Sequence, residues 1–71
     1  MNVTWKRMYL GSYHGIDDDG RTVAQIGYVI GTDGQSKGWS VYLNRYEAER
    51  FDYYPNQEAA QEAAEAALND S

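Results

Sequence analysis

Residues 23–43 decide the fold, because they read VAQIGYVI, then GTDGQSKG, then WSVYL. The two outer segments are rich in β-branched and aromatic residues and alternate in polarity, which is typical of strands. The polar, glycine-containing segment between them is typical of a turn. We therefore predict a β-hairpin with strands over 21–30 and 39–44. Its predicted buried centre consists of Ile26, Trp39, Val41 and Leu43.

The segments on either side of the hairpin complete a sheet and add one helix. Residues 5–16 form a further extended segment in which Gly11 indicates a bulge or a break. The predicted sheet has three strands, or four if residues 50–54 form a further short strand. Asn56 is a good N-cap, and alanines recur at helical spacing after it, so a helix is predicted over 56–69. The sequence thus predicts one α+β domain over 1–71, an antiparallel three- to four-stranded sheet with one C-terminal helix packed on one face.

Composition limits the class of protein. The chain has 71 residues, no cysteine and a net charge of −5. A small domain without disulfides is expected in a reducing compartment, and no apolar run approaches the length of a membrane span, so we expect a cytoplasmic protein. The initial methionine and polar end lead us to expect a complete short reading frame. The acidic balance disfavours direct nucleic-acid binding.

The charge is concentrated near the C-terminus. Residues 1–43 hold four basic and four acidic side chains, whereas residues 44–71 hold two basic and seven acidic ones. Glu58, Glu62 and Glu65 are three or four apart on the predicted helix, where like charges repel. Either these carboxylates only promote solubility, or they bind a basic partner.

No residue pattern indicates catalysis, a cofactor or a metal. His14 is the single histidine, and no nucleophile–base pair stands near it. The run Asp17-Asp18-Asp19-Gly20 lacks the ligand spacing of a calcium loop, so we interpret it as a turn. We expect no enzymatic activity.

Tyrosines are the second candidate for binding. One helix covers only one side of a sheet, so some of the seven tyrosines must be partly exposed, where they suit a protein interface or simply tolerate half-exposure. The predicted partner-binding residues are Glu47, Glu49, Asp52, Glu58, Glu62, Glu65, Tyr42 and Tyr53.

Several residues carry a resemblance to short phage or prophage proteins. These are Trp5, the Gly38-Trp39 pair that opens an inner strand, and Pro55-Asn56 before the alanine-rich end. The chain is similar to such proteins, which include small anti-defence inhibitors of the anti-CRISPR kind. The order of strands and helix also resembles the AP2-type DNA-binding domain, but Gln25, Ser40 and Tyr42 stand where that domain has cationic side chains.

Three functions are therefore expected, in this order. The first is a non-enzymatic, phage-encoded inhibitor that binds a basic, nucleic-acid-handling host protein through the acidic residues. The second is a phage accessory or structural protein that forms a homodimer through the uncovered side of the sheet. The third is a nucleic-acid-binding sheet-plus-helix module.

Overall fold

The computed structural model describes residues 2–9, 11–44 and 49–69. These residues form five strands and one helix. In chain order the elements are β1 (Thr4–Tyr9), β2 (Ser12–Ile16), β3 (Thr22–Ile30), β4 (Lys37–Leu43), β5 (Glu49–Tyr54) and α1 (Gln57–Asn69).

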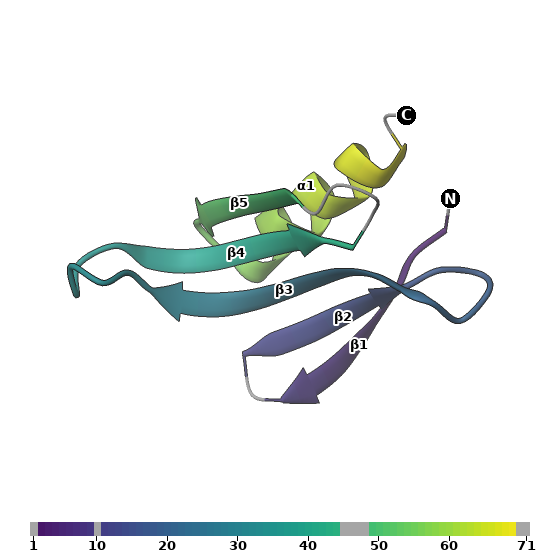
Figure 1. The fold of residues 1–71 in the computed structure, drawn as a ribbon, viewed down its shortest axis with the longest axis horizontal. Helices are drawn as coiled ribbons and strands as arrows, with labels where there is room; N and C mark the ends of the chain where they lie inside the picture. The colour runs from purple at the N-terminus through teal and green to yellow at the C-terminus, as the bar shows by residue number, and fades with distance from the viewer. Residues whose placement is uncertain (1, 10, 45–48, 70–71) are drawn as a thin grey trace.

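The strands form one antiparallel sheet in which each strand pairs with the next along the chain (Figure 1). The α+β class and the C-terminal helix are confirmed, but the predicted count of three or four strands is too low. The extended segment 5–16 is two strands, because Gly11 has a φ of 76° in the left-handed region that glycine adopts readily. The chain reverses there, and the short strand over 50–54 is present as β5.

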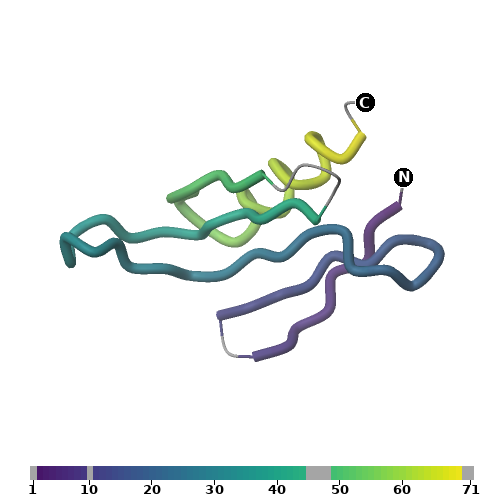
Figure 2. The backbone as a smooth tube through the Cα atoms, viewed as in Figure 1, coloured from purple at the N-terminus to yellow at the C-terminus, as the bar shows by residue number. Residues whose placement is uncertain are grey.

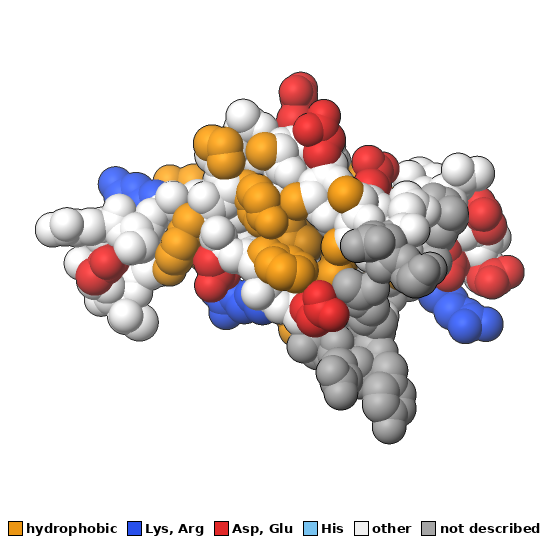
Figure 3. Space-filling model, turned by 90° about the horizontal axis from the view of Figure 1, so that it is seen from above, with side chains coloured by type: hydrophobic (Ala, Val, Ile, Leu, Met, Phe, Trp, Pro, Cys, Tyr) orange, Lys and Arg blue, Asp and Glu red, His pale blue; other side chains and the backbone are white. Residues whose placement is uncertain are grey.

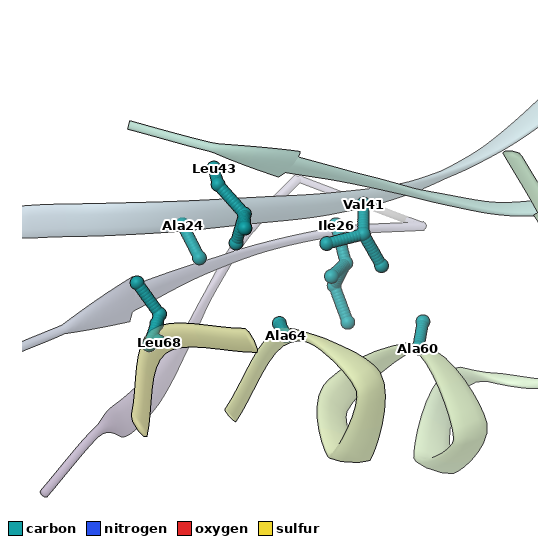
Figure 4. Close-up of a cluster of buried hydrophobic side chains, with 7 residues drawn as sticks. All are labelled: Ala24, Ile26, Val41, Leu43, Ala60, Ala64 and Leu68. Atoms are coloured by element: carbon teal, nitrogen blue, oxygen red, sulfur yellow. The ribbon is translucent and has the colours of Figure 1, made fainter. Parts of the chain in front are cut away.

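The core lies between α1 and the central strands. Ala24 and Ile26 of β3 and Val41 and Leu43 of β4 point at the helix, as Figure 4 shows. The facing residues of the helix recur every fourth position, as Ala60, Ala64 and Leu68. Small alanine side chains allow α1 to approach the sheet closely, so the larger sheet residues fill the space between the layers.

Trp39 is only partly buried and packs at the border of this core, so the predicted buried centre is correct for its three aliphatic members. β3 and β4 extend past α1 toward their connecting turn (Figure 2). Tyr28 and Ile30 lie on that extension and are 49% and 60% exposed, although they alternate in phase with Ile26. The alternation of apolar residues therefore indicates which side of β3 faces the helix. It does not indicate how far along β3 the helix extends.

The turns and the helix start depend on short polar side chains. Asp17 Oδ1 accepts hydrogen bonds from the backbone N–H groups of Asp19 and Arg21, both at 2.9 Å, so the acidic run is the predicted turn. Asn56 Oδ1 accepts from the Ala59 N–H at 2.8 Å and caps α1.

Asp33 holds the β3–β4 turn in the same way. Its Oδ1 accepts from the N–H groups of Ser36 and Gln35 at 2.8 and 2.9 Å. These backbone hydrogen bonds hold the pKa of the Asp33 carboxyl below its usual value, and the bond from Ser36 has the largest effect. The ionised carboxylate is thus the form that fits the turn.

Candidate interaction surfaces

The helix acids divide into two groups. Glu58 and Glu62 are exposed, and no cation in the described part of the chain pairs with either. Glu65 instead is half-buried and accepts a hydrogen bond from Trp5 Nε1 at 3.2 Å. This bond connects α1 to the edge strand β1, whose Trp5 lies on the helix side of the sheet, so the structure gives Glu65 a role within the fold.

Asp52 also has partners within the fold. Its Oδ1 accepts from Ser40 Oγ and from Arg50 Nε, each at 2.7 Å. These two hydrogen bonds lower the pKa of the Asp52 carboxyl. The bond from Ser40 has the larger effect and the bond from Arg50 the smaller one. Ser40 alternates with the core residue Val41, so this cluster lies on the side of the sheet away from α1. Asp52 and the helix acids therefore lie on opposite sides of the sheet.

The two predicted tyrosines are likewise separated. Tyr42, 40% exposed, alternates with Val41 and Leu43 and faces away from α1. Tyr53, 42% exposed, has a φ of 65° where the β4–β5 pairing shifts register. It reaches toward the β3–β4 turn, because a Cβ on Gly31 would lie 2.8 Å from its hydroxyl oxygen.

Of the remaining predicted residues, Glu47 lies outside the described residues. Glu49 is half-buried at the start of β5 and has an interaction of its own. Glu58 and Glu62 are therefore the predicted acids that the structure leaves exposed and without a pairing cation among the described residues.

An apolar surface lies on the side of the sheet that carries α1. Phe51 pairs with Val41 on the helix side of edge strand β5 and is 38% exposed. Figure 3 shows hydrophobic side chains gathered over β5 and α1 with acidic side chains at their border. We call Phe51, Glu58 and Glu62 the acid-bordered surface. Exposed aromatic area next to unpaired charge suits a protein contact.

The other side of the sheet, away from α1, we call the open face, since no described element covers it. Strand register aligns one side chain from each strand across it. The row is Lys6, His14, Gln25, Tyr42 and Arg50.

A shallow hollow lies beside this row. It has a volume of about 310 Å³ and is lined by Ser12, Gln25, Gly27, Ser40, Tyr42 and Arg50 among others. Gly27 has no side chain to fill the space. Sequence alone did not group these residues, because their alignment depends on the register of five strands. The alternation of Gln25 with Ile26 and of Tyr42 with Val41 was the available signal.

No three histidine, cysteine, aspartate or glutamate side chains within 2–9, 11–44 and 49–69 are placed to share a metal ion. In the same part of the chain no helix has the length and apolarity needed to cross a membrane.

Comparison with known proteins gives no match: no protein-family model, no curated protein and no solved structure matches the chain.

Proposed function

We propose that this protein is a non-enzymatic binding protein that uses the acid-bordered surface to bind a basic surface of another protein. The observation that carries the proposal is the pair Glu58 and Glu62, which are exposed and unpaired within the described residues, on the side of the sheet where Phe51 is also exposed. Two like charges one helical turn apart cost stability in the isolated protein. A basic partner removes that cost and gains an attraction.

The partner proposed is a nucleic-acid-handling protein of a bacterial host, and the protein itself a phage-encoded inhibitor in the host cytoplasm. Such a partner presents lysines and arginines that bind phosphates, and a row of carboxylates is complementary to the same groups. Phe51 supplies apolar area that is removed from water on binding, which charge pairs alone do not provide.

The test compares two double variants with the same change of charge. A tagged wild-type protein is mixed with host lysate, and each captured protein is quantified across a series of salt concentrations. Glu58→Gln with Glu62→Gln should weaken capture of the specific partner about tenfold or more. The control, Asp18→Asn with Asp19→Asn, removes two exposed acids at the opposite end of the sheet and should leave capture unchanged.

Salt provides the second measurement. Capture should fall steeply as salt rises, because screening weakens contacts between exposed charges. A partner captured equally by both double variants, or with no dependence on salt, would show that the acid-bordered surface is not the binding site.

A further inference from the structure

The row Lys6, His14, Gln25, Tyr42 and Arg50 runs across all five strands. Neighbouring strands are about 4.8 Å apart, so the row extends about 19 Å from β1 to β5. A cation stands at each end, and an aromatic ring and an amide stand between them. This order matches a ligand that carries negatively charged groups at intervals and flat groups between them.

The charge of the open face differs in sign from that of the whole chain. Among its described strand residues Lys6 and Arg50 are basic, and Asp52 is the one carboxylate, held by Arg50. The whole chain carries a net charge of −5, so the remaining surface is acidic. An anion approaching the protein is therefore favoured on the open face over the helix side.

The hollow adds space for a flat group. Tyr42 forms one wall and the backbone at Gly27 is unobstructed by a side chain. The Gln25 amide and the Ser12 hydroxyl line the same hollow and carry both donors and acceptors. Ser40 Oγ donates its proton to Asp52, so its lone pairs remain as acceptors. A base stacked on Tyr42 would have hydrogen-bonding groups at its edge.

From the row, the charge and the hollow together, we propose that the open face binds a short single-stranded nucleic acid. One base stacks on Tyr42 in the hollow, and Lys6 and Arg50 contact phosphates on either side. The row accommodates on the order of four nucleotides, the lower end of single-strand site sizes. This site is independent of the acid-bordered surface.

A second copy of the chain fits the open face less well. Five strands of five to nine residues give a flat area of about 500 Å² per copy. A stable dimer needs about 800 Å² per partner. An acidic peptide would use the two cations but would leave the hollow beside Tyr42 without a flat occupant.

The experiment is a fluorescence anisotropy titration of labelled eight-nucleotide single-stranded DNA and RNA at about 25 mM salt, where phosphate contacts are strongest. The wild type should bind and should weaken as salt rises. Tyr42→Ala should weaken binding about fivefold or more, and Tyr42→Phe should retain most of it, because the ring does the stacking. Thermal unfolding of each variant verifies that it is folded.

Lys6→Gln and Lys37→Gln form a matched pair of charge variants. Both lysines are exposed, but Lys37 alternates with Trp39 onto the helix side. Lys6→Gln should reduce the slope of log affinity against log salt by about 0.7, and Lys37→Gln should reduce it less.

Several results would overturn the proposal. These are no binding at millimolar protein, equal losses for Lys6→Gln and Lys37→Gln, or full affinity in folded Tyr42→Ala. Poly-glutamate that competes as well as the oligonucleotide would assign the open face to acidic protein segments instead. Dimerisation of the free protein that Tyr42→Asp abolishes, without oligonucleotide binding, would assign it to a second copy.

Discussion

Ile26 and Ile30 lie on the same side of the same strand but differ in burial. Ile26 is 2% exposed and Ile30 60% exposed. Replacing either residue by alanine removes the same atoms, so the difference between the two variants measures the contribution of the core beneath α1. The side chain of Ile26 points at Ala60 and Ala64 (Figure 4). Neither alanine is large enough to fill the space that its removal leaves.

The expected cost of Ile26→Ala follows from this geometry. A fully buried isoleucine replaced by alanine costs about 2–5 kcal/mol, and we expect a value of about 3 kcal/mol. A domain of 71 residues has a total stability of about 4–11 kcal/mol. The variant should therefore lose a large part of its stability, with a fall in Tm of about 12–24 °C. Ile30→Ala should cost less than about 1 kcal/mol.

Urea unfolding followed by circular dichroism measures both values, with the midpoints compared at constant slope. Equal losses of stability in the two variants, or a loss below about 1 kcal/mol in Ile26→Ala, would contradict this expectation. Either outcome would mean that α1 does not cover β3 as described.

Three further predictions concern single polar contacts. Asn56→Ala should lower the free energy of unfolding by about 1 kcal/mol, because the N-cap of α1 is lost, and Asn56→Ser should restore more than half of it in the same urea assay. Trp5→Phe should cost about 1 kcal/mol, whereas Glu65→Gln retains an acceptor oxygen and should cost less; equal losses would argue against the hydrogen bond. Asp33 and Asp52 have a folded-state pKa below the ordinary 3.8, so their contribution is present above that pH and is lost as pH falls through the folded-state pKa. Acid titration of Asp33→Asn and Asp52→Asn should show a weaker pH dependence below pH 3.8 than the wild type, and an unchanged acid limb would contradict the two pKa shifts.

The sequence predicted those parts of the fold that have local signals. The hairpin of β3 and β4 has alternating strands and a turn held by Asp33, and α1 has a cap at Asn56 and apolar residues every fourth position. A bulge or a break at Gly11 was predicted because a glycine within a strand often marks one. Its φ of 76° and the resulting pair of strands depend on the pairing of β1 and β2, which is not local.

The candidate surfaces were less predictable than the fold, because their residues come together through strand register and side-chain hydrogen bonds. Glu65 is on the predicted helix, but its contact with Trp5 joins residues 60 positions apart in the chain. Asp52 lies within the register shift between Phe51 and Tyr54, on the open face with Arg50. The charge pattern therefore identified the acidic residues, and tertiary pairing determined which of them remain available.

The bond between Trp5 and Glu65 also has a consequence for folding kinetics. Each strand pairs with its neighbour in sequence, so the sheet can grow one hairpin at a time with short loops to close. The Trp5–Glu65 contact closes nearly the whole chain, across 60 residues, and should form after the folding transition state. Its loss in Trp5→Phe should thus accelerate unfolding and leave the folding rate almost unchanged.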